Sequence, residues 1–350
     1  MEVFQNAFNN TRVLIVGGAG FVGSNLAKMV LASSPSVHVH IIDNLLSAER
    51  FNVPHAANVT FTEGSISDDR VLNTLEDSYD YVFHLATYHG NQSSIHDPLA
   101  DHENNTLTTL KLFERLKSFK KLKKVVYSAA GCAVAEKTFD EATASKECET
   151  VHLDMDSPYS ISKIIGEFYS KYYHKQHQLP VVRARFQNVF GPGEVLGAGK
   201  WRGTPATVWR NVTPTFIYRA LKKMPLPLEN EGIATRDFIF VDDIARGLIH
   251  CALFGKEGDV YNLATGEEIS IRELAEGINA LTENPTPPDQ LPKRPWDNSG
   301  KRFGCPEKAR VELKFVAKTP FLEGLKTTIA WTRENLALIE STMQKHDAHL

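Results

Sequence analysis

Two side chains on one predicted helix could act together as an acid–base pair. Tyr159 and Lys163 are four residues apart, so they share one face of a helix, and the preceding Ser157-Pro158 is typical of a helix start. A free phenol has a pKa of about 10, and a neighbouring ammonium group stabilises its anion. The pair could therefore use Tyr159 as a proton acceptor near neutral pH. Because this spacing also arises by chance, an exposed helix pair is the alternative.

A second set of residues, near the N-terminus, could hold a dinucleotide. Gly17, Gly20 and Gly23 follow the apolar run Val13–Val16. Glycines at this spacing allow a tight turn, a close approach of backbone to pyrophosphate, and packing of the next helix on the strand. Asp43 ends the following apolar run, where a carboxylate accepts hydrogen bonds from the ribose hydroxyls of NAD and repels the 2′-phosphate of NADP. The motif therefore predicts bound NAD, with the tyrosine–lysine pair acting beside its nicotinamide.

Strand-like and helical segments alternate over the first half of the chain. The strand-like runs cover residues 13–16, 37–42, 58–62, 81–86, 124–128 and 181–186, and the helical ones 21–32, 71–75, 100–116 and 159–174. Such alternation predicts a parallel sheet covered on both faces, which is a doubly wound α/β (Rossmann) fold. The regular alternation of strands and helices ends after residue 190, which predicts a smaller C-terminal substrate domain. We expect residues 1–190 to form the NAD-binding domain, with 236–262 returning to it, and 191–235 and 263–350 to form the second.

Composition excludes several classes of protein. The chain has 350 residues, 42% of them hydrophobic, and a formal net charge of -3, which argues against a dedicated nucleic-acid binder. No apolar run approaches the roughly 20 residues needed to cross a bilayer, and the N-terminus lacks the pattern of a signal peptide. The four cysteines match no zinc or CxxC spacing. We therefore expect a cytoplasmic protein with reduced thiols, no membrane contact and no metal.

These motifs, with several others, resemble the extended short-chain dehydrogenase/reductases that act on nucleotide sugars. The further matching stretches are Ile42-Asp43-Asn44-Leu45, His84-Leu85-Ala86, Asp97-Pro98 with Asn105, Asn188–Pro192, Arg236–Asp243 and Arg294–Asp297. The resemblance covers nearly the whole chain. It implies a nucleotide-diphosphate sugar substrate, and a homodimer that pairs through helices 100–116 and 159–174.

The resemblance also implies individual roles. The implied cofactor contacts are Gly17, Gly20, Phe21, Val22, Gly23, Asp43, Asn44, Ser65, Ile66, Leu85, Ala86, Tyr159 and Lys163. Asn188 and Asn211 are placed near the sugar diphosphate, Arg236 and Arg294 on the diphosphate, and Asp297 on the ribose of the substrate. Guanidinium groups suit phosphate oxygens, although loop arginines can also simply face solvent.

One stretch departs from the family pattern. The family has a serine or threonine hydroxyl beside the tyrosine, but the matching position here is Ala130, and Ser128 could serve only if the loop shifted. Cys132 occupies the position at which dehydratases and decarboxylases carry a glutamate and some epimerases a cysteine. A thiol has a pKa of about 8.5 and can move a proton next to a ketone. Cys132 is therefore either catalytic or a small core residue.

The segment 193–213 is long and irregular, which is typical of functional loops. We expect it to lie over the sugar, with Lys200, Arg202 and Arg210 able to read a carboxylate or phosphate of the substrate. Its tryptophans could stack on a ring or pack the loop. His89 could face the sugar too, but we expect a solvated loop histidine.

These features predict an NAD-dependent nucleotide-sugar epimerase. Tyr159 would take the proton of the sugar 4-hydroxyl, a transient 4-keto sugar would form, and NAD would be regenerated in each cycle. The ketone would either turn over and be reduced on its other face, or Cys132 would first act on an adjacent C–H bond. A 4,6-dehydratase, a decarboxylase and a non-catalytic dinucleotide sensor remain alternatives.

Overall fold

The computed structural model describes residues 4–135, 138–295, 297 and 300–349, apart from the side chain of Cys132. Its centre is a seven-stranded parallel sheet in the order β11-β6-β5-β4-β1-β2-β3. The strands are β1 (Arg12–Val16), β2 (His38–Asp43), β3 (Val59–Glu63), β4 (Tyr81–His84), β5 (Lys124–Ala130), β6 (Val181–Phe186) and β11 (Val260–Leu263). The strand order reverses between β1 and β4, which is where doubly wound folds bind ligands. The predicted α/β fold class is confirmed.

Both faces of the sheet are buried because its strands are apolar at successive positions. In β1, Val13 and Ile15 join the core under α1 (Phe21–Ser33) and α8 (Val241–Phe254), whereas Leu14 and Val16 join the core on the opposite face. That second face is covered by α2 (Asp69–Leu72), α5 (Thr108–Leu116) and α6 (Pro158–His177). Alternate side chains of a strand point to opposite faces, so only a strand buried on both sides has this pattern.

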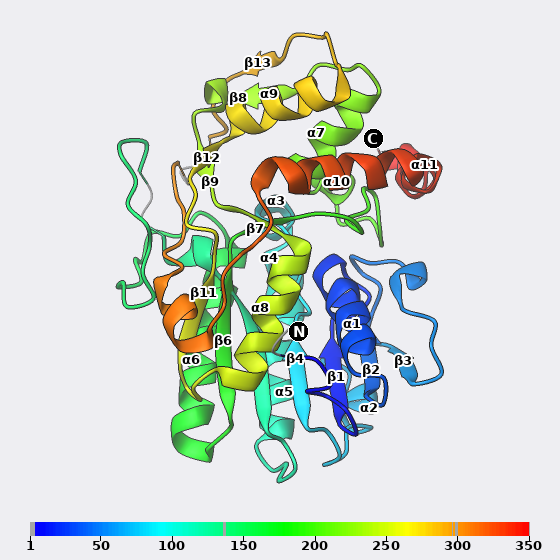
Figure 1. The fold of residues 1–350 in the computed structure, drawn as a ribbon, viewed down its shortest axis with the longest axis vertical. Helices are drawn as coiled ribbons and strands as arrows, with labels where there is room; N and C mark the ends of the chain where they lie inside the picture. The colour runs from blue at the N-terminus through cyan, green and yellow to red at the C-terminus, as the bar shows by residue number, and fades with distance from the viewer. Residues whose placement is uncertain (1–3, 136–137, 296, 298–299, 350) are drawn as a thin grey trace.

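A second core lies beyond the carboxyl ends of the strands, above the sheet in Figure 1. Its helices are α7 (Val212–Leu221), α9 (Ile271–Thr282) and α10 (Phe321–Glu334), followed by α11 (Leu336–Gln344). Three two-stranded sheets lie outside the main sheet: β7 (Asn188–Phe190) with β10 (Phe238–Phe240), β9 (Thr235–Arg236) with β12 (Ile269–Ser270), and β8 (Pro227–Glu229) with β13 (Asp289–Leu291). The predicted domain bounds remain a prediction.

Residues 193–211, which we call the lid, connect β7 to α7. Apolar lid residues pack on α11: Val195, Leu196 and Val208 share a core with Ile339 and Met343. The ring of Trp201 stacks on His349 at 4.8 Å, and that of Trp209 lies 5.9 Å from Tyr218. The tryptophans therefore pack the lid, although Trp209 also borders the cavity described below.

Several predicted elements have different bounds. The helix expected over residues 100–116 is preceded by α3 (Asn91–His96) and begins with α4 (Pro98–Asp101). Residues 102–107 then form a wider π-helical turn before α5. Near the C-terminus, α10 is followed by Asn335, whose side-chain amide donates to Trp331 O, and a new helix begins there as α11. Within the described residues, no helix is long and apolar enough to cross a bilayer.

Candidate active site

A cavity of about 780 Å³ opens between the carboxyl edge of the sheet and the second core. The residues predicted to contact the cofactor and the nucleotide part of the substrate line it, whereas Lys200 and Arg202 of the lid do not, and the side chain of Cys132 lies outside the described residues. The lining includes Gly17, Gly20, Phe21, Val22, Gly23, Asp43, Asn44, Ser65, Ile66, Leu85, Ala86, Tyr159 and Lys163, together with Asn188, Asn211, Arg236, Arg294 and Asp297. Residues far apart in the chain thus share one cavity.

The glycine loop leaves no room for side chains. Gly17 has a φ of +86°, and a Cβ there would lie 2.5 Å from Ala86 N, while a Cβ at Gly23 would lie 2.3 Å from Gly17 O. Gly20 begins α1 without a capping side chain, so the first N–H groups of this helix remain available to an anion. The loop therefore fits a dinucleotide pyrophosphate.

Asp43 is held at the end of β2 by backbone donors. Ala19 N and Leu45 N donate to its two carboxylate oxygens at 3.0 and 2.9 Å. Burial raises the pKa of Asp43, and these N–H groups act in the opposite direction. Each oxygen keeps acceptor capacity, so the carboxylate can receive the two hydroxyls of a ribose.

Tyr159 and Lys163 lie in the first turns of α6, which Ser157 caps by accepting from Ser160 N. The Lys163 side chain is 4% exposed, and its Nζ donates to Ser128 O at 3.0 Å. The same Nζ lies 5.8 Å from the centre of the Tyr159 ring. The ammonium group is thus fixed close enough to stabilise a phenolate.

The predicted substrate arginines lie on the side of the second core. Arg236 Nη1 donates to Thr235 O and Gly300 O, both at 2.6 Å. Arg294 pairs with Glu229, and its side chain is 40% exposed. Among the basic lid residues, Arg210 lines the cavity, Arg202 is buried outside its lining, and Lys200 is exposed.

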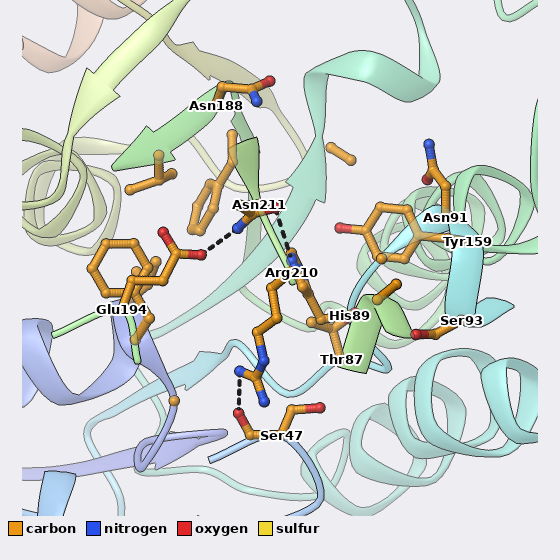
Figure 2. Close-up of a pocket in the computed structure, with 18 of the residues that line it drawn as sticks. Ser47, Thr87, His89, Asn91, Ser93, Tyr159, Asn188, Glu194, Arg210 and Asn211 are labelled. Atoms are coloured by element: carbon orange, nitrogen blue, oxygen red, sulfur yellow. Dashed lines mark hydrogen bonds between the residues drawn. The ribbon is translucent and has the colours of Figure 1, made fainter. Parts of the chain in front are cut away.

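The sequence missed a row of three hydrogen-bonded side chains across the cavity (Figure 2). Asn211, at the start of α7, donates its amide N–H to Glu194, and its Oδ1 lies 3.2 Å from His89 Nε2. The His89 ring in turn lies edge-on to Tyr159 at 6.5 Å. The expectation of a solvated His89 is therefore wrong. No periodicity marks Glu194; its only signal is a carboxylate directly after Gly191-Pro192-Gly193.

Burial sets the charge states of this row. It raises the pKa of the Glu194 carboxyl to about 7, and one oxygen of this group, Oε2, has no hydrogen-bond partner among the described residues. Burial and the charges of Arg202 and Arg210 lower the pKa of His89 to about 4. Since Asn211 Oδ1 needs a donor, His89 is a neutral ring that carries its proton on Nε2.

A sequence model of the NAD-dependent epimerase/dehydratase family matches residues 13–264. The chain belongs to this family. A crystal structure of Bordetella bronchiseptica WbmF in complex with NAD+ and UDP is 66% identical, with a TM-score of 0.89 and 99% of each chain covered.

Curated relatives of the family carry both dehydratase and epimerase names. The dTDP-D-glucose 4,6-dehydratase of Dictyostelium discoideum is 29% identical over 76% of this chain and 61% of its own length. The UDP-glucose 4-epimerase of Mycolicibacterium smegmatis is 28% identical over 92% and 98%. The chain spans between 48% and 61% of the length of the first curated relatives it matches. The cofactor of the family is NAD, and the glycine loop and Asp43 fit it.

The departure from the family pattern persists in the structure. Ala130 lines the cavity with a methyl group, and Ser128 Oγ instead donates to His84 O at 3.0 Å, so that hydroxyl is bonded to β4. Ser128 acts through its carbonyl, which receives Lys163. His89 is a polar ring that lies edge-on to Tyr159 on the cavity side.

Proposed function

We propose that this enzyme is a nucleotide-sugar epimerase that works through a transient 4-keto sugar and keeps its NAD. The observation that carries the proposal is the single cavity. The dinucleotide cradle lines one part of it, arginines of the second core line another, and Tyr159 with Lys163 belongs to the same lining. UDP-sugars are the first substrates to test, because the WbmF structure holds UDP.

In this proposal Tyr159 accepts the proton of the sugar 4-hydroxyl and later returns it to the reduced sugar. Lys163 stabilises the phenolate between these two transfers. NAD, when bound, supplies the acceptor and then the donor of the C4 hydride. Arg236, Arg294 and Asn188 hold the diphosphate, which leaves the sugar able to present either face.

Contacts of the lid support the proposal that NAD is retained. Gly199 N donates to Glu49 Oε1 at 2.8 Å, and Lys200 N donates to Leu46 O at 3.1 Å. Both acceptors follow Asp43 in the loop after β2. A lid bonded to that loop covers the dinucleotide side, which supports a cofactor recycled in place rather than exchanged.

A 4,6-dehydratase or decarboxylase is the second candidate, because curated relatives include 4,6-dehydratases. Residue 132 favours the epimerase. It is a cysteine in this chain, whereas the resemblance places a glutamate at this position in 4,6-dehydratases and decarboxylases. Cys132 as a base beside the 4-keto group is part of the proposal.

The test is incubation with a panel of UDP-, GDP- and dTDP-sugars in D₂O, followed by mass spectrometry and NMR. A C4 epimer without label supports simple 4-epimerisation. Deuterium at C3 or C5, lost in Cys132→Ser, supports the thiol as base. A product lighter by one water identifies a dehydratase, and no product with any sugar supports a dinucleotide sensor.

We also propose the homodimer that the resemblance implies, paired through α6 and the helical segment 100–116, which begins in α4. This face exposes the apolar side chains Ile161, Phe168, Tyr172 and Leu99, the last two 53% and 80% exposed. Exposed apolar residues clustered on helices mark protein interfaces, and a second copy of the same helices would bury them.

A further inference from the structure

Arg210 carries a positive charge into the cavity without an ion-pair partner. Its side chain donates to three backbone carbonyls: Ser47 O at 2.7 Å, Thr207 O at 3.4 Å, and Ala198 O. Within the described part of the chain, no carboxylate forms an ion pair with it. A guanidinium has five N–H donors, so these three bonds to neutral carbonyls leave two of its N–H groups without a partner among the described residues.

The surroundings of Arg210 disfavour its charge. Burial, with the neighbouring charge of Arg202 as the next cause, lowers the pKa of Arg210 to about 9, and the carboxylates of Glu194 and Glu49 offset only part of this shift. A desolvated cation whose hydrogen bonds all go to carbonyls is stabilised further when an anion bonds its remaining N–H groups. The part of the cavity next to the Arg210 guanidinium therefore favours binding of an anionic group.

The position of Arg210 indicates which anion this is. Figure 2 shows the side chain extending from beside Asn211 towards Ser47, in the loop that follows Asp43. Pro192, the residue directly before the lid, contacts α1, where Asn25 Nδ2 donates to Pro192 O at 3.0 Å. Arg236 and Arg294, by contrast, bond residues of the second core side, Gly300 and Glu229. Arg210 therefore borders the dinucleotide part of the cavity.

We propose that Arg210 binds the diphosphate of NAD, which would lie between this lid residue and the N-terminus of α1. The helix end contributes only about half a unit charge, whereas the diphosphate carries two negative charges. A guanidinium from the lid supplies a full positive charge and two fixed N–H donors. The inference rests on the proposed dinucleotide site but not on the reaction, and it reassigns Arg210 from the substrate to the cofactor.

The test compares Arg210→Met and Arg210→Gln with Lys200→Met, which removes one charge from an exposed position of the same lid. NAD retained per purified chain is measured after acid release. Dissociation constants for NAD, ADP-ribose, UDP and UDP-glucuronate are then measured by calorimetry on nucleotide-free protein. We expect both Arg210 variants to raise the Kd of NAD and of ADP-ribose at least tenfold and equally, because both ligands share the diphosphate. UDP and UDP-glucuronate should bind as before, and Lys200→Met should match the wild type.

Three results would overturn the proposal. Unchanged NAD and ADP-ribose binding with weaker UDP binding would place the anion on the substrate diphosphate. A loss confined to UDP-glucuronate would place it on a sugar carboxylate. No change with any ligand would leave Arg210 a packing residue of the lid. If Arg210→Met fails to fold, as judged by thermal unfolding, Arg210→Gln decides by the same criteria, because its amide can still donate to Ser47 O. All of these readouts measure binding and none measures turnover. They therefore test the role of Arg210 even if the enzyme proves not to be an epimerase.

Discussion

Gly17→Ala should damage the cofactor cradle through a single methyl group. The backbone of Gly17 has a φ of +86°, and the added Cβ would lie 2.5 Å from Ala86 N and 2.7 Å from Ala86 Cα. Strained backbone conformations cost about 1–3 kcal/mol, and overpacking costs about 1–3 kcal/mol more. The contacted atoms belong to the backbone and cannot rotate aside. We therefore expect the free energy of unfolding to fall by about 2–6 kcal/mol, unless the loop shifts to relieve the contact.

Gly90→Ala is the matched control, because Gly90 has a φ of +100° but nothing within 4 Å of an added Cβ. It should show the backbone strain alone, about 1–3 kcal/mol. The assay is thermal unfolding of nucleotide-free protein, together with NAD released per chain. Gly17→Ala should melt below Gly90→Ala and retain little NAD. Equal melting temperatures and full NAD in both variants would refute the steric argument.

Three further predictions follow from the site and the surface. Tyr159→Phe should lower kcat by about 10²–10⁴ while NAD binding, measured by calorimetry, stays within twofold; normal turnover would exclude Tyr159 as the base. Burial raises the pKa of Glu194 from 4.5 to about 7, so the folded state binds the proton more tightly than the unfolded state, and this contribution to stability is lost as pH rises from about 4.5 to 7. Glu194→Gln should therefore gain in melting temperature relative to wild type between pH 5 and pH 8, and a constant difference would contradict the assigned pKa. Phe168→Asp should shift the protein from dimer to monomer in light scattering, and a wild-type monomer would exclude the proposed interface.

Local patterns in the sequence predicted the fold and much of the cavity lining. The glycine spacing, Asp43 at a strand end and the tyrosine–lysine pair each lie within one strand–turn–helix unit, so their geometry depends on a few neighbouring residues. Alternating strands and helices predicted the doubly wound sheet. Even the element bounds mostly differ by a few residues, with the π-helical turn at 102–107 as the main local surprise.

The expectation for His89 was wrong because its contacts are to residues far away in the sequence. Its partner Asn211 is 122 residues away, and Glu194, the third member of the row, comes from the lid. No local period encodes such contacts, because they depend on the path of the lid after β7. The same holds for Ser128, whose hydroxyl bonds to β4 because of the pairing of β4 with β5.

The sequence by itself determined that a dinucleotide cradle precedes a tyrosine–lysine helix on a parallel sheet, because backbone sterics and helical periodicity are local. Only the tertiary structure decided which charges meet around the cavity. The sequence shows Arg210 only as a basic residue of the lid. Its hydrogen bond to Ser47 O, 163 residues earlier, is seen only in the fold. Contacts at that separation form only when the lid packs on α11 and on the loop after β2, so burial and charge compensation are properties of the assembled chain.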